Sequence, residues 1–223
     1  MRPIWEGDTV QGQRGKAVIF DYGNVLAQTL DPRPRAHWER HCGLPPGALE
    51  RLVHNTHSWI AAQCGRISAE AHWHETARTL NLTREEAVAL QSTFYSGDLL
   101  NMAIVTRLDA LRVAGIPTAL LSNFSTDLRR LLRQQDLLRR FDHLAISAEI
   151  GVMKPDVAAY QAVLAMLAVP ATACIFVDDH PDNVAAARAL GMQGVVFDNT
   201  PACLAALDGL LVPLLGAARM VPP

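Results

Sequence analysis

Several features that would assign this chain to a specialised class are absent. The 223 residues contain only four cysteines, which are widely spaced, and no pair has the spacing of zinc ligands. No apolar run is long enough to cross a membrane, and the first 15 residues lack the apolar core of a signal peptide. We therefore expect a cytoplasmic protein with reduced thiols.

The charge balance excludes two further kinds of partner. With 20 basic and 22 acidic residues, the formal net charge is −2, which gives no excess for binding nucleic acid or an anionic membrane. Arginines cluster within residues 129–140, but they alternate with leucines as the polar face of an amphipathic helix. We expect neither nucleic acid nor membrane as a partner, and the sequence leaves the oligomeric state open.

The most informative segment is the run Lys-Ala-Val-Ile-Phe-Asp-Tyr-Gly-Asn-Val-Leu at residues 16–26. Its apolar, β-favouring residues predict a strand buried on both faces, as in a parallel sheet. The strand delivers Asp21 into a turn that contains Gly23, at the edge where open α/β sheets bind ligands. By itself this pattern also fits an ordinary strand-to-helix turn, so its meaning depends on the rest of the chain.

A second predicted strand, residues 118–121, ends in groups suited to bind an anion. Ser122 and Asn123 follow it directly, and their side chains can donate hydrogen bonds to phosphate oxygens. Capping of the next helix is assigned more readily to Ser125 or Thr126. Ser122 is therefore left without a structural role.

A lysine precedes a later predicted helix. We expect Pro155 at the first helical position, which places Lys154 at the helix entrance. A positive charge there opposes the helix dipole, so a purely structural role is unfavourable. An ammonium group beside Asp21 would keep the carboxylate ionised and would bind phosphate as a point charge.

Two adjacent carboxylates end a further apolar strand at residues 174–177. Asp178 and Asp179 repel each other at a buried strand end unless a cation or a donor lies between them. Their oxygens suit Mg²⁺, which takes one or two carboxylates and keeps water and phosphate as its other ligands. A solvated loop, with Asp182 or Asn183 capping the next helix, is the alternative, but it does not account for Asp178 and Asp179.

Together these four segments closely resemble the motifs of the haloacid dehalogenase superfamily, in the same order, over about residues 16–199. The sequences Phe-Asp-x-Gly-Asn-Val and Val-Asp-Asp-x-x-x-Asn-Val are similar to the phosphatase branch that contains bacterial α-D-glucose-1-phosphate phosphatases and the phosphatase domain of soluble epoxide hydrolase. The resemblance implies an α/β fold with a doubly wound, Rossmann-like parallel sheet core and an inserted helical cap.

The resemblance also implies an activity. Asp21 would be the nucleophile that forms an aspartyl phosphate, Lys154 would bridge it to the phosphate, and Ser122 and Asn123 would bind the phosphate. The implied enzyme is a Mg²⁺-dependent phosphomonoesterase, a hydrolase acting on a small phosphorylated metabolite, and the branch favours a sugar phosphate.

The metal site implied by the resemblance contains one departure. Asp21, the backbone carbonyl of Gly23 and Asp179 would hold Mg²⁺, with Asp178 behind these ligands. Most phosphatases of the family have a second aspartate, a general acid and base, where this chain has Gly23. Such assistance is typically worth roughly 10²–10⁴-fold in rate. We expect a modified phosphatase rather than an inactive one.

The resemblance further implies a division of the chain into three parts. Residues 31–102 read as helices with no convincing strand, and Thr83 with Glu86 forms a capping box in this segment. The parts are an amino-terminal extension at 1–15, a catalytic core at 16–30 plus 103–223, and a helical cap at 31–102. After the cap we expect strands at 118–121, 143–146, 174–177 and 195–197 and a last helix at 204–218.

Two alternative functions remain open. A metal-free haloacid dehalogenase would use the same carboxylate and also lacks the second aspartate, but it has no use for the Asp178 and Asp179 pair. A catalytically weak binding or regulatory protein of the same fold is motivated by Gly23. The presence of Asp21, Lys154 and the other motif residues together argues against this second alternative.

Overall fold

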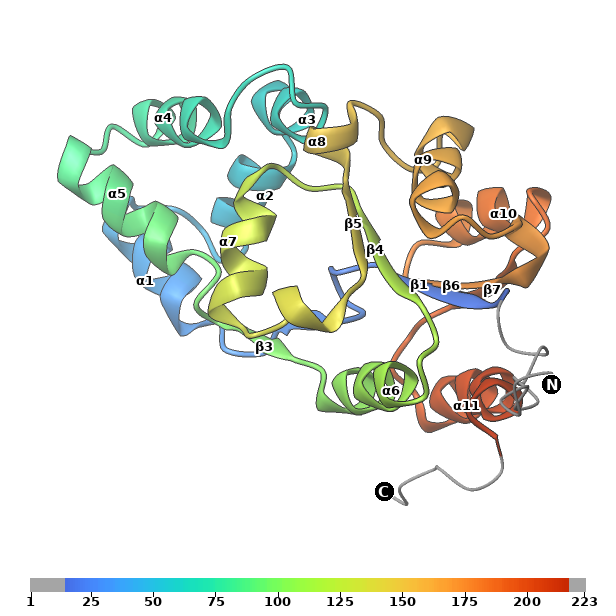
Figure 1. The fold of residues 1–223 in the computed structure, drawn as a ribbon. Coiled ribbons are helices and arrows are strands. Elements are labelled where there is room, and N and C mark those ends of the chain that lie inside the picture. Colours follow the sequence, from blue (N-terminus) through green and yellow to red (C-terminus); the bar gives the residue numbers. More distant parts are fainter. Residues whose placement is uncertain (1–14, 217–223) are drawn as a thin grey trace, which may run out of the picture.

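The computed structural model describes residues 15–216, and a parallel five-stranded sheet forms its centre (Figure 1). The strands are β1 (Ala17–Phe20), β4 (Thr118–Ser122), β5 (His143–Ile146), β6 (Cys174–Asp178) and β7 (Gln193–Val196). Their order is β5-β4-β1-β6-β7, so the chain moves outward on both sides of β1. This confirms the predicted doubly wound α/β core and places its topological switch at β1.

Helices cover both faces of the sheet, namely α6 (Met102–Val113), α9 (Val157–Leu167), α10 (Pro181–Ala189) and α11 (Pro201–Leu215). Helices α6 and α11 lie on one face, and α9 and α10 lie on the other (Figure 1). Side chains of β1 alternate between these layers: Val18 and Phe20 join the cluster of α6 and α11, whereas Ala17 and Ile19 join that of α9 and α10. Burial on both faces explains why β1 is a continuous apolar run.

The remaining short elements lie between β4 and β6, and their bounds are α7 (Asp127–Gln134), η1 (Leu138–Arg140), α8 (Ser147–Ile150) and η2 (Ala171–Ala173). The predicted strand at 195–197 lies at Gln193–Val196, and the last helix begins at Pro201 rather than residue 204. The Thr200 hydroxyl caps this helix by accepting a hydrogen bond from the Cys203 N–H, which explains the earlier start.

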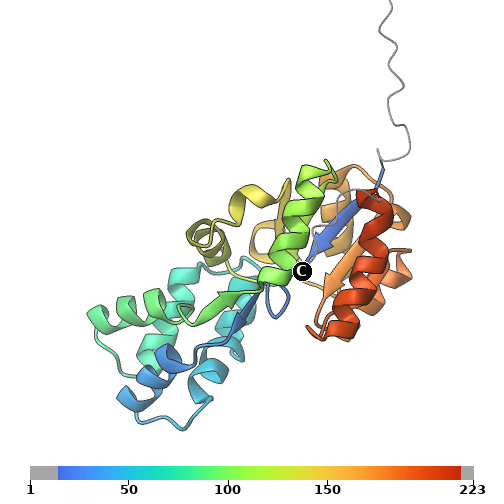
Figure 2. The ribbon, with the colours of Figure 1, turned by 90° about the horizontal axis from the view of Figure 1, so that it is seen from below.

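Five helices form an insertion between β1 and α6: α1 (Arg33–His41), α2 (Ala48–His54), α3 (His57–Gln63), α4 (Ala69–Thr79) and α5 (Arg84–Thr93). Figure 2 shows them grouped beside the sheet rather than on its faces. The capping box of Thr83 and Glu86 is present at the start of α5.

The expectation that residues 31–102 contain no strand is wrong. A three-residue strand, β3 (Asp98–Leu100), pairs antiparallel with β2 (Ala27–Thr29). Such a short strand has no readable period, and its partner lies about 70 residues away, so only the folded chain reveals it. The β2–β3 ribbon joins the insertion to the core.

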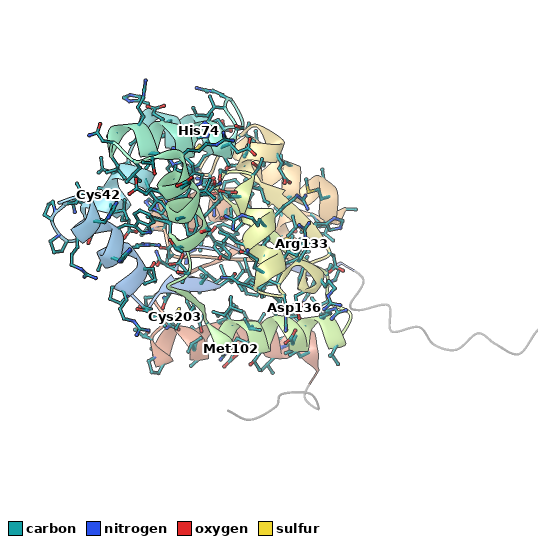
Figure 3. All side chains as sticks on the ribbon, turned by 90° about the vertical axis from the view of Figure 1, so that its left-hand side faces the viewer. Cys42, His74, Met102, Arg133, Asp136 and Cys203 are labelled. Carbon is teal, nitrogen blue, oxygen red and sulfur yellow. The ribbon has the colours of Figure 1, made fainter. Side chains whose placement is uncertain are left out.

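Two further findings concern the helices and the cysteines of the described residues. None of their helices has both the length and the hydropathy needed to span a bilayer. All four cysteines are free, and Cys42 and Cys203 lie in separate parts of the molecule (Figure 3). Of the predicted amino-terminal extension only Gly15 is described, and residues 217–218 of the predicted last helix also lie outside the described residues.

Candidate active site

The site begins with a buried ion pair at the carboxyl ends of the central strands. Asp21 follows β1 directly, and its N–H donates to the carbonyl of Val177 in β6 over 2.9 Å. The Lys154 Nζ atom lies 2.9 Å from Asp21 Oδ1 and 2.6 Å from Asp178 Oδ2, and it also donates to the Leu121 carbonyl at 2.8 Å. One ammonium group therefore links the ends of β1, β4 and β6.

Burial and charge act in opposite directions on this pair. Burial raises the pKa of Asp21, while the charge of Lys154 and hydrogen bonds from Lys154 and Ser122 oppose that rise. Burial acts to lower the pKa of Lys154, but Asp21 and Asp178 outweigh it and leave the pKa raised. Lys154 therefore stays charged, and its charge favours the ionised form of Asp21.

Lys154 is positioned by a loop rather than by a helix entrance. Helix α9 begins at Val157, with the Asp156 side chain accepting a hydrogen bond from the Ala158 N–H, so the prediction that Pro155 is the first helical residue is wrong. The asparagine carboxamide of Asn123 holds the Lys154 backbone instead: Nδ2 donates to its carbonyl and Oδ1 accepts from its N–H, each at 2.8 Å.

This pairing narrows what Asn123 can do. Its carbonyl oxygen and one amide hydrogen bind the Lys154 backbone, so only the second amide hydrogen can donate to a ligand. Ser122 is buried beside Asp21 and acts to lower the pKa of that carboxyl. The expected cap of α7 is absent, because Thr126 at the cap position makes no side-chain cap bond and the buried Ser125 hydroxyl has no partner among the described residues.

The adjacent carboxylates Asp178 and Asp179 have different surroundings. Asp178 is fully buried, and both of its carboxylate oxygens accept hydrogen bonds from Asn183 Nδ2. Its Oδ2 atom also accepts from Lys154, and its Oδ1 atom also accepts from the His180 N–H. The prediction that Asp182 or Asn183 caps α10 is wrong, because His180 is the cap residue and Asn183 binds Asp178. The charged Lys154, together with the Asn183 amide and the His180 N–H, therefore stabilises Asp178.

Asp179 is more open. It is half-buried, and its Oδ2 atom accepts a hydrogen bond of 2.8 Å from Asn24 Nδ2. Sequence reasoning did not single out Asn24, although its place three residues after Asp21 offered a signal. The Asp179 Oδ1 atom accepts no hydrogen bond within the described part of the chain.

The donor set fits a hard divalent cation. Asp21, Asp178 and Asp179 each offer an oxygen, and these oxygens lie within 4.8 Å of one another. The Gly23 carbonyl accepts no hydrogen bond from residues 15–216, so it too is available as a ligand. Because Asp178 is saturated with donors, the oxygens free for Mg²⁺ belong to Asp21, Gly23 and Asp179.

An aromatic layer lies beside these groups, and the sequence did not predict it. Phe124, next to Asn123, contacts Tyr22, next to Asp21, with ring centroids 5.9 Å apart. Phe124 also contacts two rings of the insertion, Trp59 at 5.3 Å and Tyr95 at 5.5 Å. Helix α3 lies over this edge, where Gln63 Nε2 donates to the Asn123 carbonyl at 2.8 Å.

Comparison with known proteins identifies relatives over most of the chain. Residues 16–191 match the family model described as haloacid dehalogenase-like hydrolase. A drimenol cyclase of Aspergillus calidoustus is 36% identical over 82% of this chain, which spans only 34% of that protein. A sesquiterpene phosphatase of Aspergillus oryzae is 31% identical over 85% of this chain and 93% of its own length.

Two further matches also cover about four fifths of the chain. An (S)-2-haloacid dehalogenase of Pseudomonas is 29% identical over 81% of this chain and 83% of its own length. A crystal structure of a family enzyme from Bacteroides thetaiotaomicron, in complex with magnesium and inorganic phosphate, shares the fold with a TM-score of 0.66. It is 17% identical and covers 80% of this chain and 92% of its own.

Proposed function

The chain belongs to the haloacid dehalogenase-like hydrolases, and on that basis we propose that it is a Mg²⁺-dependent phosphomonoesterase acting on a small phosphorylated metabolite. The observation that carries this proposal is the buried contact of Asp21, Lys154 and Asp178, with Ser122 beside them, at the topological switch of the sheet. A buried carboxylate next to a fixed cation is suited to attack an anionic phosphoryl group.

The proposed hydrolysis of the phosphate ester has two steps, the formation and the hydrolysis of an aspartyl phosphate at Asp21. An Asp21 carboxylate oxygen forms a bond to phosphorus while the bond from phosphorus to the leaving-group oxygen breaks. The leaving oxygen takes a proton from water, since Gly23 offers no acid. Water then attacks the phosphorus of the aspartyl phosphate, which releases inorganic phosphate and restores the Asp21 carboxylate.

The neighbouring groups bind and orient the phosphoryl group. Lys154 offsets the negative charge that Asp21 and the phosphoryl oxygens bring together, while the Ser122 hydroxyl and the free amide hydrogen of Asn123 donate to those oxygens. Mg²⁺, held by Asp21, the Gly23 carbonyl and Asp179, would supply further charge stabilisation at the phosphoryl group.

A metal-free dehalogenase is the second candidate, and the similarity to an (S)-2-haloacid dehalogenase supports it. The available oxygen of Asp179 and the grouping of three carboxylates favour the phosphatase, because halide displacement requires no cation. The similarity to a sesquiterpene phosphatase over nearly its full length points the same way.

Two classes of phosphate ester, sugar phosphates and apolar phosphates, are candidates for the substrate. The preference for a sugar phosphate, drawn from the sequence resemblance, stays a prediction. The sesquiterpene phosphatase relative and the aromatic contacts of Phe124 with Tyr22 and Trp59 support an apolar phosphate as the alternative. The cytoplasmic location and the absence of nucleic-acid and membrane partners also stay predictions.

A panel of phosphate esters and 2-haloacids, assayed with Mg²⁺ and with EDTA, tests the function. We expect phosphatase turnover that requires Mg²⁺ and is abolished in Asp21→Asn, which keeps the side-chain shape but loses the nucleophile. The matched control is Asp182→Asn, because Asp182 is an exposed carboxylate of the same strand-to-helix connection. Turnover of haloacids in EDTA, or full phosphatase activity in Asp21→Asn, would contradict the proposal.

A further inference from the structure

We infer that Asn24 is a positioning residue for the metal site, which holds Asp179 so that its free oxygen faces Asp21. This inference rests on the Mg²⁺ requirement of the proposed function. It concerns a contact across 155 residues of sequence, the 2.8 Å hydrogen bond from Asn24 Nδ2 to Asp179 Oδ2.

The backbone that presents Asn24 is fixed on both sides. The Asn24 N–H donates to the Ala27 carbonyl at 2.8 Å, and the Asn24 carbonyl accepts from Gln28 Nε2 at 3.1 Å. The Leu26 and Ala27 N–H groups both donate to the Tyr22 carbonyl, which closes the turn after Asp21. The amide of Asn24 therefore extends from a turn whose position is tied to the nucleophile.

The conformation of Asn24 explains why this residue type stands in the turn. Its φ of 54° lies in the left-handed region, which asparagine tolerates better than most residues with a side chain. Glycine would tolerate it as well, but glycine has no amide to donate. Asparagine satisfies both the backbone and the contact with Asp179.

The partner has few other restraints. Asp178 accepts hydrogen bonds from a lysine, an asparagine and a backbone N–H, whereas within residues 15–216 Asp179 accepts only that from Asn24. A half-exposed carboxylate with one oxygen held and one oxygen free is oriented for a ligand on the free side. Hydrogen bonds that orient a ligand typically affect metal affinity about 10–100-fold.

The competing explanation is that Asn24 serves the turn alone. Asn24→Gly separates the two explanations, because glycine keeps the left-handed backbone and removes only the amide. The matched control is Asn81→Gly in the insertion. Asn81 has the same φ of 54° and is exposed, and no carboxylate contact involves it within the described residues.

Mg²⁺ titration of the purified proteins by isothermal calorimetry, together with Tm in EDTA, provides the test. We expect Asn24→Gly to weaken Mg²⁺ binding about 10–100-fold, whereas Asn81→Gly leaves the Kd for Mg²⁺ unchanged. A wild-type Kd in Asn24→Gly, with or without a lower Tm, would overturn the inference. Absence of Mg²⁺ binding in the wild type would overturn the metal requirement itself, and both variants would then also show none.

Discussion

At the residue scale, the adjacent residues Asp178 and Asp179 differ in burial and in the hydrogen bonds that they accept. Asp178 ends β6 inside the protein, where Lys154 and Asn183 satisfy it. Asp179 is one residue further, outside the strand and half-exposed. The end of the strand thus places one carboxylate in the protein interior and the next at the partly exposed edge of the sheet.

The position of Gly23 allows the missing acid to be restored. Its φ is outside the left-handed region, and a Cβ added there meets no heavy atom within 4 Å, so the backbone at this position admits a residue with a side chain. We expect Gly23→Asp to accelerate alkyl phosphates more than aryl or anomeric sugar phosphates, because poor leaving groups gain most from general acid catalysis, by up to roughly 10²–10⁴-fold. The measurement is the slope of log kcat/KM against leaving-group pKa.

The native slope is expected to be steep, and that of Gly23→Asp shallow. Gly23→Asn is the control, since the amide has a similar shape but carries no acidic proton. A flat slope in the native enzyme would show that another group already supplies the proton, and the exposed His180 next to Asp179 would be the first to examine.

His72 in α4 gives the protein a calculable response to acid. The side chain is fully buried, with Nδ1 2.9 Å from Ser58 Oγ, and burial lowers its pKa to about 4. In the unfolded chain this histidine has a pKa of about 6.5, so between pH 6.5 and about 4 the unfolded chain binds a proton that the folded protein does not bind. The contribution of neutral His72 to the free energy of unfolding is therefore fully present above pH 6.5. It falls, by up to about 3 kcal/mol, as the pH drops to about 4.

Urea denaturation between pH 4 and 8 measures this effect. His72→Asn, which retains a polar atom for Ser58 and does not titrate, should show a shallower decline in the free energy of unfolding. Ring resonances of a neutral His72 at pH 5.5 would support the same conclusion in the native protein. Parallel stability curves for the two proteins would refute it.

At the element scale, helices α3 and α4 contact the core in different ways. Trp59 of α3 packs on Phe124, the residue after Asn123, and the Gln63 side chain donates a hydrogen bond to the Asn123 carbonyl. Trp73 of α4 donates from Nε1 to Asp127 of α7 at 2.8 Å, at the start of that helix. Only the contacts of α3 involve residues adjacent to the candidate site.

This difference predicts separate effects for the two tryptophans. Trp59→Leu should change the order of preferred substrates, because it removes a ring that contacts Phe124. Trp73→Phe should leave that order unchanged and lower the free energy of unfolding by about 1 kcal/mol, the usual value of a lost hydrogen bond. The kcat/KM ranking of a substrate panel and urea denaturation test both expectations, and a changed ranking in Trp73→Phe alone would contradict them.

The elements that the sequence predicted are those whose signal is local. The strands before Asp21, Ser122 and Asp178 are continuous apolar runs, and the capping box of α5 lies within four residues. The errors concern competition between neighbours, as where Asp156 rather than Pro155 starts α9. Contacts such as Asn24 with Asp179 and Trp59 with Phe124 join distant segments, and no periodicity encodes them.

At the scale of the whole molecule, the candidate site is formed where the carboxyl ends of β1, β4 and β6 lie side by side, next to helix α3 of the insertion. Strands β1, β4 and β6 are neighbours in the sheet, so Asp21, Ser122 and Asp178 come together although they are far apart in the sequence. Lys154 reaches them from the loop between α8 and α9. The insertion starts directly after the turn of Asp21, and its helix α3 returns over the loop after β4. Asp21 and the aromatic side chains of the insertion are therefore linked by one continuous stretch of chain.

The β2–β3 ribbon brings the two ends of the insertion together. The Leu30 and Asp31 N–H groups both donate to the Gly97 carbonyl, and the Asn101 N–H donates to the Leu26 carbonyl. The approach is so close that a Cβ at Gly97 would lie 2.0 Å from the Asp31 carbonyl oxygen. The β2–β3 ribbon thus holds the two ends of the insertion together, and the length of chain between these ends can vary at an entropic cost that grows only slowly with length. An insertion of another sequence or length, and with it another substrate specificity, can therefore be joined to the same two ends while the carboxyl ends of the core strands stay unchanged.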